Sequence, residues 1–258
     1  MQNLQYVKIQ LDKYVDRFNT IEFIDSDPVQ IPHRFSRKED IEISGFLAST
    51  IAWGQRKSII KNALRLMDLM DNSPYDFLIN ANEKNDFQRF SKFVHRTFNG
   101  EDCIFFIKSL KNIYSYYNGL ENVFANGFNK KQSIYSALEH FRSVFFEIPH
   151  SHRAEKHLSD VTRNSAAKRL NMFLRWMVRS DGAGVDFGIW KEIPQSALML
   201  PLDVHSGNVA RYFGLLTRQQ NDWKAVEEIT AVLRTFDAAD PVKYDFALFG
   251  AGVSGEIK

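Results

Sequence analysis

Residues 41–70 read IEISGFLASTIAWGQRKSIIKNALRLMDLM, and this stretch decides the fold class. Its apolar residues recur at intervals of three and four, which is the period of an amphipathic helix rather than of a strand. Gly54 lies in the middle, and a glycine inside a helix costs about 1 kcal/mol relative to alanine. The stretch therefore predicts two helices, or one bent helix, that break at Gly54.

Outward from this stretch, the chain keeps a helical period and shows no repeat or low-complexity tract. Upstream, two X-Pro pairs predict an extended approach, and Asp40 is the expected helix cap. We expect the last glycines, 250–252, to be loose. No stretch alternates apolar and polar residues as a sheet would, so the predicted class is all-α. The further helices are expected at Phe105–Tyr117, Ile134–Phe146, Asn164–Ser180, Val204–Phe213, Trp223–Phe236 and Pro241–Phe249.

Composition limits the class of protein further. The chain has 258 residues, 44% hydrophobic and 25% charged, which suits one globular domain or two small lobes. No apolar run reaches the roughly 18 residues of a membrane helix, and the N-terminus lacks a signal-peptide core, so we expect a cytoplasmic protein without a membrane partner. The single cysteine, Cys103, excludes a disulfide within the chain and cysteine-ligated zinc or iron–sulfur sites built from this chain alone.

Histidines offer a metal site that we discount. His150, His152 and His157 lie close together in the sequence. A spacing of two residues does not place two histidines on one helical face, and no fixed carboxylate partner is evident. We therefore predict neither a metal nor another cofactor.

Charge is distributed unevenly although the net charge is only +2. Trp53–Met67 contains four bases and no acid, and His150–Asp181 contains seven bases and three acids. Each segment therefore carries +4, and the remainder of the chain is acidic. Such segments suit a polyanionic partner, and the alternative is an ordinary solvated charge run.

The segment Asn164–Ser180, NSAAKRLNMFLRWMVRS, predicts a helix with two unlike faces. Leu170, Phe173, Leu174 and Met177 fall on one side of a helical wheel. On the opposite side, Lys168, Arg175 and Arg179 fall within about 40° of one another at 100° per residue. We expect the first face to pack and the second to be exposed and basic.

Lys168 and Asp203 form the candidate catalytic pair. Lys168 is expected in the first turn of its helix, where the positive end of the macrodipole favours the neutral, nucleophilic amine that Schiff-base chemistry needs. The alternative is a plain surface lysine. Asp203 precedes a helix and is expected to cap it through the N–H of His205 or Ser206, a role that is compatible with catalysis.

Three segments then resemble the helix-hairpin-helix DNA glycosylases. LPLDVHSGNVARYFGL, residues 200–215, is similar to the segment with their catalytic aspartate, and SAAKRLNMF, residues 165–173, to the hairpin helix with the lysine nucleophile of bifunctional members. FLASTIAWGQ, residues 46–55, resembles the helix that ends in a polar turn against the flipped-out nucleotide. The resemblance covers roughly 41–252, and the archaeal 8-oxoguanine branch is most similar. The chain as a whole also resembles an uncharacterised bacterial family related to these enzymes.

The resemblance implies a role for each candidate residue. Lys168 and Asp203 would be catalytic, and the partner would be double-stranded DNA with a damaged base. Trp53, Phe187 and Trp190 would stack on the extruded base, although each also suits the core. Contacts to DNA are expected from Gln55, Arg56, Lys57, Arg163, Asn164, Ser165, Arg175, Arg179 and His205.

Two features depart from the family pattern. The phosphate-binding Gly-x-Gly turn is replaced by VTRNS, residues 161–165, in which Asn164 is the residue that most easily adopts a left-handed conformation. The gap between Lys168 and Asp203 is also long, owing to an insert at 181–198.

We therefore expect a monomeric, two-lobed, all-α protein of about ten helices. The middle lobe would comprise residues 46–198 and include the hairpin, and the terminal lobe 1–45 plus 199–258, with the catalytic pair in the cleft between them. The predicted function is a base-excision glycosylase with an AP lyase step, acting on an oxidised purine. The alternatives are a non-catalytic nucleic-acid-binding relative and a helical enzyme acting on a small molecule.

Overall fold

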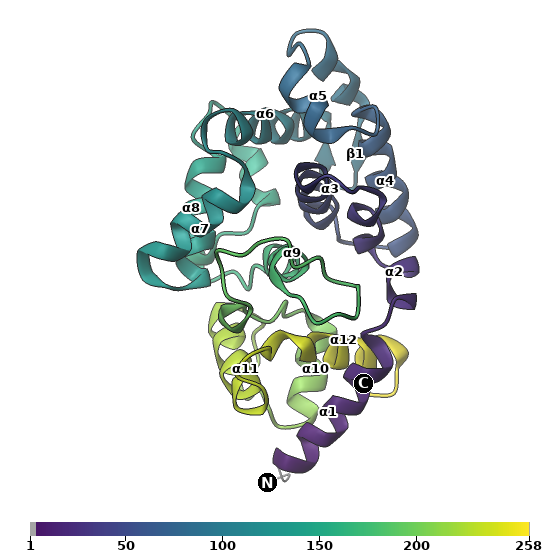
Figure 1. Ribbon diagram of the computed structural model, residues 1–258, viewed down its shortest axis with the longest axis vertical. Coiled ribbons are helices and arrows are strands. Elements are labelled where there is room, and N and C mark those ends of the chain that lie inside the picture. Colours follow the sequence, from purple (N-terminus) through teal and green to yellow (C-terminus); the bar gives the residue numbers. More distant parts are fainter. Residues whose placement is uncertain (1–3, 258) are drawn as a thin grey trace. The chain divides into compact units, whose positions relative to one another are not determined.

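The computed structural model describes residues 4–257 and is all-α, as predicted (Figure 1). The chain forms two compact units. Unit 2 is the continuous segment Ser26–Ser159, whereas unit 1 combines the described residues of Met1–Asp25 and Asp160–Lys258. These boundaries differ from the predicted lobes, because α9 (Lys168–Val178) belongs to the same unit as α10 (Val204–Tyr212). Lys168 and Asp203 therefore lie within one unit and do not come from two different lobes.

Unit 2 is built around phenylalanines. Phe141 stacks on Phe124 with ring centroids 4.2 Å apart and meets Phe46 edge-on at 5.5 Å. All three side chains are fully buried. The elements are η1 (Pro28–Gln30), η2 (Pro32–Arg34), α3 (Lys38–Thr50), α4 (Arg56–Leu69), α5 (Pro74–Asn80), η3 (Asp86–Lys92), β1 (Val94–His95), β2 (Phe98–Asn99), α6 (Gly100–Tyr116), α7 (Leu120–Lys131), α8 (Ile134–Phe145) and η4 (His152–His157).

Local sequence explains most element ends in unit 2. The predicted break between α3 and α4 is confirmed, with Gly54 at φ +103°, a backbone conformation that favours glycine. The prediction that Asp40 caps α3 is wrong. That helix already begins at Lys38, and the Asp40 carboxylate instead accepts a hydrogen bond from the N–H of Tyr75 at the start of α5. The β1–β2 hairpin is too short for sequence periodicity to show.

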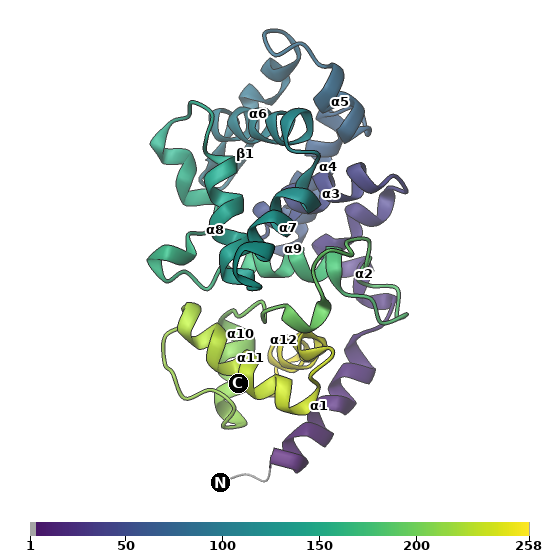
Figure 2. The same ribbon diagram turned by 60° about the vertical axis from the view of Figure 1, so that its left-hand side comes forward.

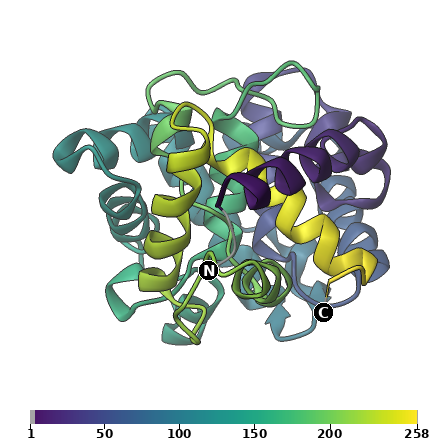
Figure 3. The ribbon, with the colours of Figure 1, turned by 90° about the horizontal axis from the view of Figure 1, so that it is seen from below.

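Unit 1 closes by packing its first and last helices together. Figure 3 shows α1 (Leu4–Phe18) alongside α12 (Tyr244–Ser254). Tyr244 donates to Asp12 at 2.9 Å, and a Cβ on Gly250 would lie 2.3 Å from the Phe18 ring. The segment Gly250-Ala251-Gly252, predicted to be loose, is helical, and the lack of a side chain at Gly250 permits the close approach of α12 to α1.

Further helices complete unit 1 (Figure 2). α10 packs against α12, and α9 carries a buried apolar face as predicted. The short α2 (Glu22–Ser26) lies at the boundary between the units. Among residues 4–257, no helix combines the length and apolarity needed to cross a bilayer. The remaining elements of unit 1 are η5 (Val161–Arg163), α9 (Lys168–Val178), η6 (Gln195–Ala197), α10 (Val204–Tyr212), α11 (Trp223–Phe236) and η7 (Pro241–Lys243).

Candidate active site

The predicted pair comes together in unit 1. Lys168 is the first residue of α9, and Asp203 is the N-cap of α10. The Lys168 Nζ lies 3.9 Å from the Asp203 Oδ2, with the two side chains 27% and 22% exposed. Both side chains are thus accessible from solvent and are held by the starts of two different helices.

The two oxygens of Asp203 have different partners. Oδ1 accepts hydrogen bonds from the Ser206 N–H at 3.0 Å and the Ser206 hydroxyl at 3.1 Å, while the Asp203 N–H donates to that hydroxyl. This capping box confirms the predicted cap. Oδ2 is the oxygen nearest to Lys168. Capping and a contact with the amine therefore coexist in one carboxylate.

The backbone of Asp203 is also fixed. The Asn221 side-chain amide donates to the Asp203 carbonyl at 2.9 Å, and Arg211 donates to the Asn221 Oδ1 at 2.6 Å. Gly207 makes this possible, because a Cβ there would lie 2.7 Å from the same Asn221 oxygen. Arg211, the arginine of the family-like segment, thus positions Asp203 through Asn221.

Apolar groups from α9 and α12 surround the amine. The Lys168 Nζ lies 3.5 Å from the Met172 sulfur and 5.8 Å from the centre of the Phe249 ring. The same ring meets His205 edge-on at 6.3 Å. α10 and α12 approach closely here, since a Cβ on Gly252 would lie 3.0 Å from the His205 Cβ. The exposed His205, expected from the sequence to contact DNA, thus lies at the edge of the site.

A second carboxylate, Asp245, belongs to the site although sequence reasoning did not include it among the candidate residues. It is 6% exposed and forms an ion pair with Arg175. Burial raises the pKa of Asp245 to about 6, against the attraction of Arg175 and Lys168, and Asp203 raises it further. Its position at the start of α12, one turn before Phe249, was the signal in the sequence that it faces the site.

Arg175 and Arg179 do not form an exposed basic face, which corrects the prediction. They are 3% and 1% exposed. Arg175 pairs with Asp186 and Asp245, and Arg179 pairs with Asp186, Asp181 and Asp240. Although burial acts against it, the carboxylates of Asp186 and Asp240 raise the pKa of Arg179. Acids distant in sequence neutralise these arginines, so neither side chain is available to DNA.

The predicted DNA-binding turn keeps its shape, and its polar groups are bonded to neighbouring carboxylates. Asn164 adopts the expected left-handed conformation, at φ +62°. Its amide donates to Asp222 at 2.8 Å, and its carbonyl accepts from the Trp223 N–H. A hydrogen bond from Arg218 lowers the pKa of Asp222 to about 2, which keeps that carboxylate ionised.

Two other predicted residues belong to the same turn. Arg163 is exposed and forms an ion pair with Asp160 at 3.4 Å. The backbone of Ser165 pairs with that of Asp222 in an isolated antiparallel β-bridge. The turn is therefore anchored to the start of α11 by hydrogen bonds and bordered by two carboxylates, in contrast to a phosphate-binding loop of bare N–H groups.

The predicted stacking residues are divided between the two units. Trp190 is 1% exposed and packs edge-on against Phe173, so its assignment to a base pocket is wrong: it fills the core of unit 1. Phe187 is half-buried in unit 1. Trp53 is half-buried in unit 2, where it contacts His95 edge-on at 5.0 Å and stacks on His157 at 6.0 Å.

Gln55, Arg56 and Lys57 lie where the sequence placed them, at the start of α4 in unit 2. Gln55 is the N-cap of this helix without a capping side-chain bond, and Arg56 and Lys57 are its first two residues. Gln55 and Lys57 are exposed. These residues are thus accessible, and Lys57 belongs to a larger basic surface that is described below.

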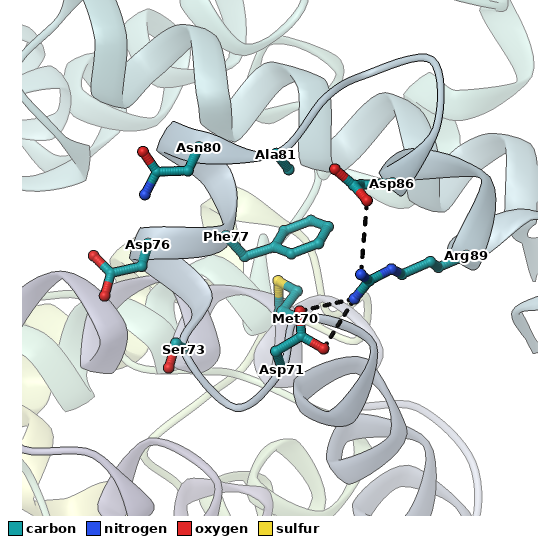
Figure 4. Close-up of a pocket in the computed structure, with 9 residues that line it drawn as sticks. All are labelled: Met70, Asp71, Ser73, Asp76, Phe77, Asn80, Ala81, Asp86 and Arg89. Carbon is teal, nitrogen blue, oxygen red and sulfur yellow. Dashed lines mark hydrogen bonds and ion pairs between the residues drawn. The ribbon is translucent and has the colours of Figure 1, made fainter.

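A pocket of about 310 Å³ lies elsewhere in unit 2 (Figure 4). Met70 and Phe77 form its apolar part, and Arg89 joins Asp71 to Asp86 beside it. None of the predicted site residues lines this pocket. In the described part of the chain, no group of three or more metal-ligating side chains could hold a metal ion.

Comparison with known proteins gives a family. No curated protein and no solved structure matches the chain. The family described as "protein of unknown function (DUF2400)" matches residues 27–254. The match spans most of the 258 residues and contains Lys168, Asp203 and Asp245. The chain therefore belongs to the DUF2400 family.

Proposed function

We propose that the protein is a base-excision DNA glycosylase with AP lyase activity, which removes a damaged base, most simply an oxidised purine. The observation that carries the proposal is the 3.9 Å approach of the Lys168 amine to the Asp203 Oδ2. The resemblance of residues 165–173 and 200–215 to the helix-hairpin-helix glycosylases supports it. A lysine beside a fixed carboxylate at a partly exposed site is the arrangement that Schiff-base chemistry needs.

The chemistry begins with access to the sugar. A base stacked in duplex DNA shields its glycosidic carbon, so the nucleotide must first be flipped out. The neutral Lys168 amine then attacks C1′ of the sugar, and the bond from C1′ to the base breaks. The bonding electron pair leaves with the base, which takes up a proton.

Asp203 contributes in two ways. Its charge stabilises the cationic sugar that develops as the base leaves, and Oδ2 accepts a proton from the nitrogen once that nitrogen is bonded to C1′. Opening of the sugar ring gives an imine between Lys168 and C1′. Loss of a proton from C2′ then expels the 3′ phosphate and cleaves the strand.

One observation favours a second function, a nucleic-acid-binding relative without turnover. The turn at 161–165, where glycosylases of this type bind a phosphate, is bordered by two ion-paired carboxylates, Asp160 and Asp222. Loss of a phosphate contact at this turn would lower the rate of base excision more than the overall affinity for DNA. Borohydride trapping on a panel of duplexes, each with one lesion, separates the two functions and also separates them from small-molecule chemistry. Only a Schiff-base enzyme becomes covalently attached to DNA.

Lys168→Gln should abolish borohydride trapping and leave the fold intact. Lys168 is partly exposed at a helix start, where removing a positive charge costs little stability or slightly increases it. Adduct on a denaturing gel is the measurement, and Lys191→Gln is the matched control. A Lys168→Gln protein that still forms the adduct would remove Lys168 from the mechanism.

Asp203→Asn separates the cap from the catalyst. Asparagine caps helices about as well as aspartate, so the free energy of unfolding should change by less than ~0.5 kcal/mol. Loss of the negative charge should lower the single-turnover rate by about 10²–10³. If the Asp203→Asn protein keeps full activity on the duplex that the wild type cleaves best, Asp203 has no catalytic role and acts only as a helix cap.

A further inference from the structure

Three bases form a stripe along α4. Lys57, Lys61 and Arg65 follow one another at intervals of four residues, which places them on the same face of the helix, and all three are exposed. Four residues rise about 6 Å along a helix, so the charges are evenly spaced. We name these three residues the α4 stripe.

Two more bases extend the α4 stripe sideways. The Arg65 guanidinium donates to the Lys92 carbonyl at 3.3 Å, which places Lys92 beside it. Asn62, next to the stripe, contacts His95 at 2.9 Å and so holds the β1–β2 hairpin along α4. Arg96, in the turn of this hairpin, reaches the start of α4, because a Cβ on Gly54 would lie 2.9 Å from its Nη1.

These five bases are not neutralised within the protein. Between residues 4 and 257, Lys57, Lys61, Arg65, Lys92 and Arg96 have no carboxylate at ion-pair distance, whereas Arg37 and Arg89 in the same unit each pair with two acids. Like charges four residues apart on a helix repel, and each such pair costs roughly 0.2–0.5 kcal/mol. The first turn of α4 contains no acid, so its bases also oppose the helix dipole.

The geometry points to a polyanion as the compensating partner. An amphipathic membrane helix would need a free apolar face, but the apolar residues of α4 are either buried in unit 2 (Ile59, Ala63, Leu66 and Met67) or half-buried (Ile60, Leu64 and Leu69). The residues of α4 that are fully exposed are all polar or charged, and basic residues predominate among them, which is typical of contacts to a phosphate backbone.

We infer that the α4 stripe, together with Lys92 and Arg96, binds the phosphate backbone of double-stranded DNA. The inference rests on the proposed function for its choice of DNA as the polyanion. Since the turn at 161–165 is bordered by carboxylates, the stripe supplies phosphate contacts that this turn lacks. The contacts are to the backbone, so binding by the stripe is independent of sequence.

The test compares two triple variants of the full chain. Lys57→Gln/Lys61→Gln/Arg65→Gln removes the stripe, and Lys84→Gln/Lys130→Gln/Lys131→Gln removes the same charge from exposed positions elsewhere in unit 2. The probe is a fluorescent, undamaged duplex, titrated at several salt concentrations from about 50 to 200 mM. The slope of log K against log salt should become shallower by about 0.9 for each lost phosphate contact, so by about 2–3 for the stripe variant and hardly for the control.

The outcomes are distinguishable from those that test the chemistry. Equal slopes for the two variants, or tighter binding to phosphatidylserine vesicles than to DNA, would overturn the inference even if borohydride trapping succeeds. A slope that falls only in the stripe variant supports it, and absence of trapping on every lesion would then count against the glycosylase alone. Unchanged circular dichroism and melting of both triples exclude unfolding as the cause, since all six positions are exposed.

Discussion

The helices α4 and α9 begin from the same kind of sequence and end in opposite environments. Each belongs to a segment of charge +4. On α4 the bases Lys57, Lys61 and Arg65 are exposed and have no carboxylate partner among residues 4–257. On α9 the guanidinium groups of Arg175 and Arg179 are enclosed by aspartates. The positive charge on α4 is thus available to a partner, whereas the charge of these α9 arginines is neutralised by ion pairs within the protein.

The difference arises from residues far away in the chain. Asp240 lies 61 residues from Arg179, and Asp245 lies 70 residues from Arg175. Local composition counts the bases of a helix but not the acids that tertiary structure brings to them. A basic segment therefore indicates a binding surface only when the nearby acids are known, and three substitutions test this contrast between α4 and α9.

The largest effect is expected for Arg179→Met. It would leave Asp186, Asp240 and Asp181 around a site without a counterion, and breaking such a buried pair typically costs about 3–5 kcal/mol. Lys61→Met on α4 is the matched control and should change stability by less than ~0.5 kcal/mol. Denaturant unfolding measures both. Similar midpoints for the two variants would show that Arg179 is not a buried counterion in solution.

An intermediate effect is expected from the pH dependence of Asp245. Its pKa in the folded protein, about 6, lies above the ordinary value for aspartate. Between the two values the folded state binds more protons than the unfolded state, so this group's contribution to stability falls as the pH rises. From pH ~4 to ~7, wild type should lose on the order of 2 kcal/mol relative to Asp245→Asn.

The comparison is a series of unfolding curves for the two proteins at matched pH. Arg175 keeps its pairing with Asp186 in the variant, which limits unrelated damage. A stability difference that stays flat across this range would mean that Asp245 titrates as an exposed aspartate does.

The smallest effect has the opposite sign. Lys57 is the second residue of α4, where a positive charge opposes the helix dipole. Lys57→Glu should therefore stabilise the protein by about 0.3–1 kcal/mol, with Lys57→Gln in between. The same unfolding experiment applies. A loss of stability would reveal a structural contact of Lys57 and weaken the contrast with α9.

Much of the site could be predicted because its determinants are local. The position of Lys168 in the first turn of α9, the cap by Asp203 and the left-handed Asn164 each depend on a few neighbouring residues. The all-α class follows from the helical period of the segments. Lys168 and Asp203 were paired through resemblance, since 35 positions separate them and periodicity does not relate two helices.

The errors share one physical cause, which is tertiary pairing across long stretches of chain. The burial of Arg175 and Trp190, the helical 250–252 segment and the role of Asp245 all depend on contacts between distant elements. The bounds of the two units differ from those of the predicted lobes for the same reason. The sequence shows where α1 lies but not that it packs against α12.

The pairing of α1 with α12 also sets an order of assembly on the ribosome. Tyr244 is made 232 residues after its partner Asp12, which corresponds to roughly 10–50 s of synthesis. Throughout that interval the apolar face of α1, with Val7, Leu11 and Val15, lacks the helix that covers it. Unit 2, continuous in the chain, is complete well before then. In the nascent protein, unit 2 can thus be folded while the apolar face of α1 is still uncovered. Lys168, Asp203 and Asp245 reach their final surroundings only after α12 has been synthesised and has packed.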